Sequence, residues 1–186
     1  MKFWQRSRLL QQQPRSHTEG SIEFINEQWV FFDEENDEAT NLEHFFEQEV
    51  EIFRHNQWIK GVLKEEAVIL EDQKYILLKN NDTLKVKKQL ILALELLMND
   101  LSDDAFIQML TTLNGLKFSL FDCIFCHNHL SFLEQASIRQ GTNFILFDNG
   151  EMVCSVHHHF SYGEKKRDRF EFTLNTGKRL MIEKLT

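Results

Sequence analysis

Apolar and polar residues alternate along the chain from residue 21 onward, which is the pattern of β-strands with one buried face. Asn26-Glu27 forms a predicted two-residue turn that places Phe24 and Trp29 on one face. A second predicted turn, at His55-Asn56, brings Phe53 opposite Trp58. Further short apolar runs continue to residue 86, separated by turn residues. We therefore expect about five or six short antiparallel strands in a small barrel-like module.

The apolar spacing then becomes helical. Residues 90–98 carry a wide apolar stripe, which predicts one amphipathic helix. Ser102 is expected to cap a second helix, and Gly115 is expected to end it. Ser119 followed by Asp122 resembles a capping box, so a third helix is predicted to begin there and to continue through the next residues.

The last part of the chain alternates again, around the strongest hairpin signal in the sequence. Asn149-Gly150 accepts the positive φ angles of a type I′ turn. The resulting register pairs Ile145 with Cys154 and places Cys154 and His158 on the apolar face, whereas the histidines on either side of His158 point the other way. These strands are expected to form a four-stranded antiparallel meander.

Together these patterns predict an α+β protein. Residues 1–19 are predicted to be a polar tail and residues 20–87 the β-rich, barrel-like module. Residues 88–186 are predicted to form an α+β unit, with helices over residues 88–140 packed on a β meander over residues 141–186.

Composition narrows the classes of function. The 29 acidic residues outnumber the 21 basic ones and give a formal net charge of −8, so the average surface repels phosphate backbones and anionic lipids. We expect no nucleic-acid or membrane partner, although an unknown protein partner fits this composition. No apolar run is long enough for a signal peptide or a membrane span, which predicts a cytoplasmic location. In that reducing compartment the three cysteines do not indicate disulfides.

One short stretch, from Asp122 to Leu130, gathers two cysteines and two histidines. On a helix, thiols at this spacing share a face, and the hairpin register directs one more cysteine and a histidine toward it. Zinc is bound by four such thiolates and imidazoles. The alternative is that the cysteines are small buried hydrophobic residues. The candidate zinc ligands are Cys123, Cys126, Cys154 and His158, with His127 as the alternative fourth ligand.

Other interpretations of the same stretch lack a necessary part. The Cys-x-x-Cys-His spacing matches covalent haem attachment, but that chemistry needs export. A thioredoxin-like pair needs a preceding strand in a βαβ unit. The His-Asn-His nuclease motif needs a second Cys-x-x-Cys and a metal-binding helix. Separately, His157 and His159 share one strand face and could chelate an ion, act as an acid-base pair, or simply be solvated.

Two passages of the chain resemble a known family. The sequence is similar to an uncharacterised family of small soluble proteins from Bacillus-type bacteria, with the resemblance extending over most of the chain. The resemblance implies a cytoplasmic bacterial protein and no particular chemistry. The passages are Gln13-Pro14-Arg15 through Thr18-Glu19-Gly20 to Gln28-Trp29-Val30-Phe31-Phe32-Asp33, and Phe121-Asp122-Cys123 through Cys126-His127-Asn128-His129-Leu130-Ser131-Phe132-Leu133.

The sequence holds no complete catalytic signature and no Gly-rich phosphate loop. We therefore expect a non-enzymatic binding or regulatory protein with a candidate structural zinc site. No catalytic residue and no other cofactor is assigned. The alternative is a zinc-dependent hydrolase or a thiol oxidoreductase that uses the Cys-x-x-Cys-His stretch.

Overall fold

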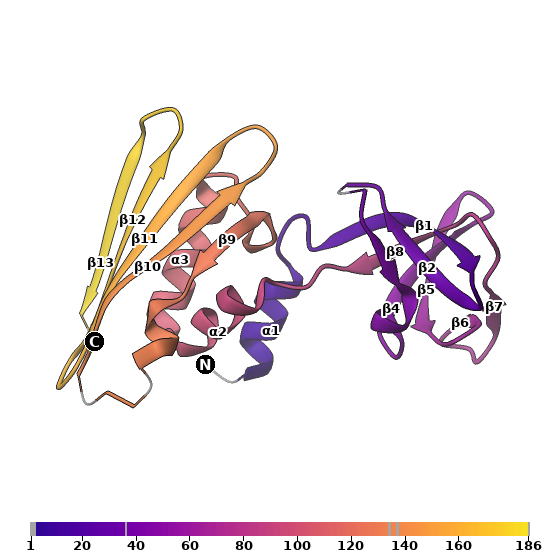
Figure 1. Cartoon of the computed structure of the whole chain (residues 1–186), viewed down its shortest axis with the longest axis horizontal. Coiled ribbons are helices and arrows are strands. Elements are labelled where there is room, and N and C mark those ends of the chain that lie inside the picture. Colours follow the sequence, from indigo (N-terminus) through magenta and orange to yellow (C-terminus); the bar gives the residue numbers. More distant parts are fainter. Residues whose placement is uncertain (1–2, 36, 134, 137, 186) are drawn as a thin grey trace. The chain divides into compact units, whose positions relative to one another are not determined.

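The chain divides into two compact units in a computed structural model that describes residues 3–185 apart from 36, 134 and 137 (Figure 1). One unit is Ser16–Lys88, and the other combines Met1–Arg15 with Gln89–Thr186. The predicted division into residues 1–19, 20–87 and 88–186 stays a prediction. Parts of the sequence predictions that fall on residues 1–2, 36, 134, 137 and 186 lie outside the described residues.

The unit Ser16–Lys88 is an antiparallel sheet of eight strands in the order β3-β2-β1-β8-β4-β5-β6-β7. This order has two ends, β3 and β7, and no ladder joins them in the part of the chain that the structure describes. The predicted antiparallel sheet is thus confirmed, whereas barrel-like closure is not. The elements are β1 (His17–Ile25), β2 (Gln28–Asp33), β3 (Ala39–Asn41), the 3₁₀ turn η1 (Leu42–Phe45), β4 (Glu49–Arg54), β5 (Gln57–Leu63), β6 (Ala67–Ile69), β7 (Tyr75–Leu77) and β8 (Asp82–Lys87).

Both predicted hairpins of this unit have the predicted register. Ile25 pairs with Gln28 across the first turn, and Phe53 pairs with Trp58 across the second, with ring centroids 5.1 Å apart. The central residues of both turns have positive φ, from 50° to 66°, as a type I′ turn requires. Local turn chemistry therefore sets the strand pairing here.

The other unit contains helices α1 (Phe3–Gln11), α2 (Leu92–Asp100) and α3 (Asp103–Gly115). Ser102 caps α3 as predicted, because its hydroxyl accepts a hydrogen bond from the backbone N–H of Ala105. The left-handed residue that ends the helix is Lys117, with φ of 68°, and not Gly115. The N–H of Phe118 then bonds back to the carbonyl of Leu113 over 2.9 Å, which completes a Schellman turn. No described helix is long and apolar enough to cross a lipid bilayer.

Helix α1 is fixed to this unit by Arg6. Its guanidinium donates to the carbonyls of Met98 and Leu101 over 2.7 and 2.8 Å and pairs with the carboxylate of Asp103 at 2.6 Å. The same group lies 4.8 Å from the centroid of the Phe106 ring. One side chain thus joins the C-terminus of α2, the N-terminus of α3 and their core.

The third predicted helix is wrong beyond its first turn. The capping box exists, since the N–H of Ser119 donates to Asp122 over 2.7 Å, but it closes only the 3₁₀ turn η2 (Leu120–Asp122). The chain then forms the strand β9 (Cys123–His127) beside β10, followed by the 3₁₀ helix η3 (His129–Leu133). Ile124 and Phe125 favour strands, and pairing with a neighbouring strand outweighs the local helix signal. The predicted helical geometry of the cysteines is lost with it.

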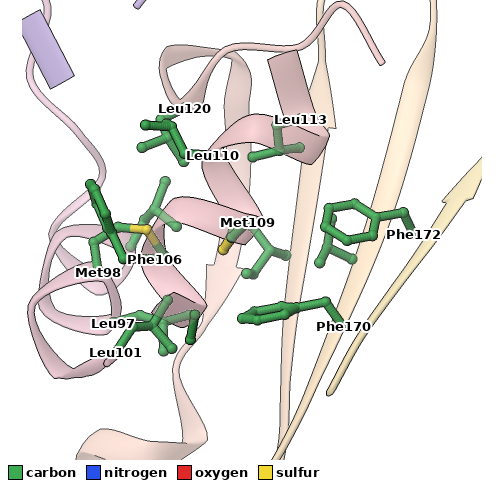
Figure 2. Packing of buried hydrophobic residues seen from close by; sticks show 14 of the residues in the cluster. Leu97, Met98, Leu101, Phe106, Met109, Leu110, Leu113, Leu120, Phe170 and Phe172 are labelled. Carbon is green, nitrogen blue, oxygen red and sulfur yellow. The ribbon is translucent and has the colours of Figure 1, made fainter. Parts of the chain in front are cut away.

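The sheet of this unit has five antiparallel strands in the order β13-β12-β11-β10-β9. The four-stranded meander consists of β10 (Arg139–Asp148), β11 (Val153–Tyr162), β12 (Lys166–Leu174) and β13 (Arg179–Leu185), and β9 adds a fifth strand. Buried side chains of α2 and α3 pack on one face, and in Figure 2 Met109 and Leu113 point toward Phe170 and Phe172 of β12. We call the opposite face, which carries Phe144, the outer face.

The register of the β10–β11 hairpin differs from the prediction by two residues. Cys154 pairs with Phe147 and not with Ile145. The turn is wider because the Asn149 side chain accepts hydrogen bonds from the N–H groups of both Glu151 and Met152. Side chains in a strand alternate with a period of two, so a shift of two leaves every residue on its predicted face.

Candidate metal centre

The five predicted zinc ligands do not come together. Cys154 and His158 are buried on the inner face of β11, whereas Cys123 and Cys126 are half-buried on β9 and His127 is exposed. Strands β9 and β11 flank β10, so their backbones are about 10 Å apart. Within the described part of the chain, these five side chains do not form a group of three ligand atoms within 4.8 Å of one another. The cysteine zinc site stays a prediction without supporting geometry.

The cysteines have the properties of packed thiols. Burial raises the pKa of Cys123 to about 12 and the pKa values of Cys126 and Cys154 to about 11. Cys123 and Cys126 pack against the hydrophobic core, and Cys154 is part of it. A thiol oxidoreductase needs a thiol whose pKa is lowered. The environment of these three groups does the opposite.

His158 is held in a buried hydrogen-bond network. The Asn143 carboxamide oxygen accepts from the N–H of Leu130 over 3.1 Å, so its Nδ2 faces His158 Nδ1, 3.1 Å away, as the donor. The His158 Nε2–H then donates to Asp168 Oδ1 over 2.8 Å. Tyr162 donates its hydroxyl to the same oxygen over 2.5 Å. Both ring nitrogens of His158 are thus in use, and the side chain is not free to bind a metal.

The partners of His158 were missed in the sequence. Asp168 lies within a run of basic residues, which indicates a solvated hairpin tip. It is directed inward because it lies two residues before Phe170 and four before Phe172, in phase with the buried positions of β12. Asn143 follows the same alternation ahead of Ile145. A polar residue in phase with the buried positions of a strand is the signal that finds such a network.

The outer face holds the ligand cluster that the structure does bring together. His157, His159 and Glu171 each offer a ligand atom, and these atoms all lie within 4.8 Å of one another. His157 and His159 share one face of β11, as predicted, and Glu171 is directly opposite His157 on β12. All three side chains are half-buried. The cluster is therefore built from two adjacent strands with the same face outward.

The surroundings of His159 leave one ring nitrogen free for a ligand role. Its Nδ1 lies 3.0 Å from the Thr142 hydroxyl. Its Nε2 is buried, has no hydrogen-bond partner and lies 3.6 Å from Glu171 Oε1. Histidines that bind metals usually hydrogen-bond through the second ring nitrogen, which fixes the ring. His159 already has this arrangement.

Two further side chains border the cluster. The Phe144 ring packs edge-on against His157 with centroids 4.9 Å apart, and 46% of Phe144 is exposed. The Arg169 guanidinium lies 3.0 Å from Glu171 Oε1, and its Nε–H is buried without an acceptor. The site is thus apolar on one side and cationic on the other.

The comparisons with known proteins place the chain in a family. The model of a family described as "Protein of unknown function (DUF2777)" matches residues 4–184. The chain belongs to this family. The expected resemblance to an uncharacterised family of Bacillus-type bacteria is confirmed, because one relative is the "Uncharacterized protein YisN" of Bacillus subtilis (strain 168). It is 29% identical over 145 residues, which cover 77% of this chain and 72% of the relative. No solved structure matches.

Proposed function

We propose that the protein is a non-enzymatic binding protein and that it binds one divalent transition-metal ion through His157, His159 and Glu171. The proximity of their three ligand atoms, all within 4.8 Å of one another on adjacent strands, carries the proposal. Two imidazoles and one carboxylate suit zinc, nickel, copper or iron, whereas calcium and magnesium prefer oxygen ligands only.

The distances suit such an ion. Ligand atoms about 2.1 Å from a tetrahedral zinc ion are about 3.4 Å from each other. His159 Nε2 and Glu171 Oε1 are 3.6 Å apart, so rotations of these half-exposed side chains are enough to close the site. The pairing of His157 with Glu171 across two strands fixes the backbone positions in advance.

The neighbouring groups favour binding over catalysis. A zinc-dependent hydrolase needs a general base beside the metal-bound water. The side chains that contact the cluster include Phe144, Thr142 and Arg169, and none of these is a base at neutral pH. Elsewhere, the pair formed by His158 and Asp168 is enclosed in the core.

Calorimetric titration of the metal-free full-length protein with Zn²⁺ or Co²⁺ tests the proposal. We expect one ion per chain, and at least a tenfold loss of affinity in His157→Ala, His159→Ala and Glu171→Gln. His127→Ala is the matched control, because this exposed histidine lies on β9, on the far side of Phe144 from His157, and its loss should leave binding unchanged.

Three results would contradict the metal site. A dissociation constant of about 1 mM or weaker would contradict the presence of a metal site. An equal loss of affinity in His127→Ala would contradict the assignment of His157, His159 and Glu171 as the ligands. Loss of binding in a Cys123→Ala/Cys126→Ala variant, with the histidine variants unaffected, would return the metal to the cysteines. Circular dichroism of each variant confirms that it is folded.

A further inference from the structure

The neighbour of the metal ligands that matters most is Arg169. It lies directly opposite His159 in the register of β11 and β12, and its guanidinium contacts the Glu171 carboxylate at 3.0 Å. A metal ion that recruits this carboxylate competes with Arg169 for the same oxygen. Metal binding therefore weakens or breaks the ion pair between Arg169 and Glu171. The Arg169 guanidinium then lacks its counter-ion and lies near the positively charged metal ion.

The charges of the loaded site do not balance. A divalent ion contributes +2, Glu171 contributes −1 and Arg169 contributes +1, so a surplus of positive charge remains in a half-buried place. Three protein ligands also leave at least one position open on the metal. Both the open position and the surplus charge favour an anion.

The described protein groups around Arg169 do not supply that anion. Glu183 of β13 is directly opposite Arg169 in register, but its carboxylate is already bound by Arg167, whose Nε donates to Glu183 Oε1 over 2.5 Å. The Nε–H of Arg169 itself is buried and lacks an acceptor. His159 Nε2 also lacks a hydrogen-bond partner, and the two residues are directly paired across β11 and β12, so a ligand held there would give both groups a partner.

Resting on the metal site proposed above, we infer that the loaded site takes a small carboxylate anion, which binds the metal ion with one oxygen and Arg169 with the other. A carboxylate fits because the group that Arg169 holds without metal is itself a carboxylate, that of Glu171. The guanidinium then donates a charge-assisted hydrogen bond to the carboxylate oxygen that the metal does not bind.

The full-length protein loaded with one equivalent of Co²⁺ provides the test, because its visible spectrum reports on the ligands of the metal. Sodium acetate is added against sodium chloride at equal ionic strength. We expect a saturable spectral change in the wild type and a half-saturating acetate concentration about threefold to fivefold higher in Arg169→Gln. Lys178→Gln is the control, because it removes an exposed cation from the turn after β12, and it should behave as the wild type.

The same variant gives a second readout that a purely structural role of Arg169 would not produce. Without acetate, Arg169→Gln should bind Co²⁺ about threefold to fivefold more tightly than the wild type, because the competitor for Glu171 and its positive charge are both removed. A merely structural arginine would lower the affinity when removed.

The outcomes separate the two proposals. Failure of Co²⁺ to bind through His157, His159 and Glu171 would overturn the metal site and this inference with it. Tight Co²⁺ binding with no response to acetate, or with an equal response in Arg169→Gln, would overturn the carboxylate alone. A response to inorganic phosphate and not to acetate would also contradict the assigned class of anion.

Discussion

His158 Nε2 lies 2.8 Å from Asp168 Oδ1, and neither side chain reaches solvent. The imidazole also stacks on the Phe170 ring with centroids 4.5 Å apart. A histidine and an aspartate in this geometry belong to many catalytic sites, but here the network joins β10, β11 and β12 through the core. Burial of Tyr162, together with the hydrogen bond that its hydroxyl donates to Asp168, raises the pKa of Tyr162 well above its ordinary value. We interpret the network as structural.

Removing the acceptor of this network should destabilise the five-stranded unit. Asp168→Ala leaves the His158 and Tyr162 donors unpaired in the core, and we expect the free energy of unfolding to fall by about 2–4 kcal/mol. Urea unfolding followed by circular dichroism measures it. Ser161→Ala, at an exposed position of β11, is the control and should change the free energy by less than about 0.5 kcal/mol. Equal stability of the two variants would show that the network contributes nothing.

The two arginines of α1 should differ sharply in their contribution to stability. Arg6 is largely buried, and burial lowers its pKa, while its guanidinium bonds two carbonyls and one carboxylate. Arg8 is exposed on the same helix. Arg6→Ala should lower the free energy of unfolding by about 2–3 kcal/mol, and Arg8→Ala by less than about 0.5 kcal/mol. Similar losses in the two variants would mean that α1 is held by something other than Arg6.

The cysteines predict how stability depends on pH. Unfolded thiols titrate near pH 8.5, whereas burial raises the pKa of Cys126 and Cys154 to about 11 and that of Cys123 to about 12. A group whose pKa is raised by folding stabilises the protein below its unfolded pKa, and this stabilisation is lost as the pH rises. We therefore expect the free energy of unfolding to fall between about pH 8.5 and 11.

A Cys123→Ala/Cys126→Ala variant isolates the thiol contribution to this pH dependence, because its decline should be shallower than that of the wild type. Alkylation by iodoacetamide at pH 7.5 gives an independent check. The native thiols should react about tenfold or more slowly than the same thiols in denaturant. Rapid alkylation of the native protein would show that a thiolate is present and would revive the redox alternative.

The sequence predicts the structure well at several positions where one local signal decides it. Both hairpins of the first sheet form as predicted, because two residues with positive φ set each register. Ser102 caps α3 for the same local reason. The prediction of a helix after Ser119 is wrong because the capping box forms but closes only one turn. The strand pairing of Cys123–His127 depends on β10, which lies later in the chain.

The candidate site shows the same division. The alternation of β11 correctly separates His157 and His159 from His158, so the two outer histidines are visible in the sequence. Glu171 is not, since its place beside them depends on the register between two strands. Cys123 and Cys126 are three residues apart, a spacing that places them on one face of a helix. On a regular strand the same spacing directs the two side chains to opposite faces.

The contacts of Arg6 tie the first helix to α2 and α3, although residues 16–88 intervene in the sequence. The eight-stranded sheet is therefore a continuous segment inserted in the sequence of the other unit, which consists of residues 1–15 and 89–186. During synthesis the whole sequence of the insertion is available before α2 is complete, so we expect it to fold first, whereas α1 must wait for residues beyond 88. Once both are folded, the ends of the inserted segment are tethered at two points, and it cannot be lost by a single cut in either connection.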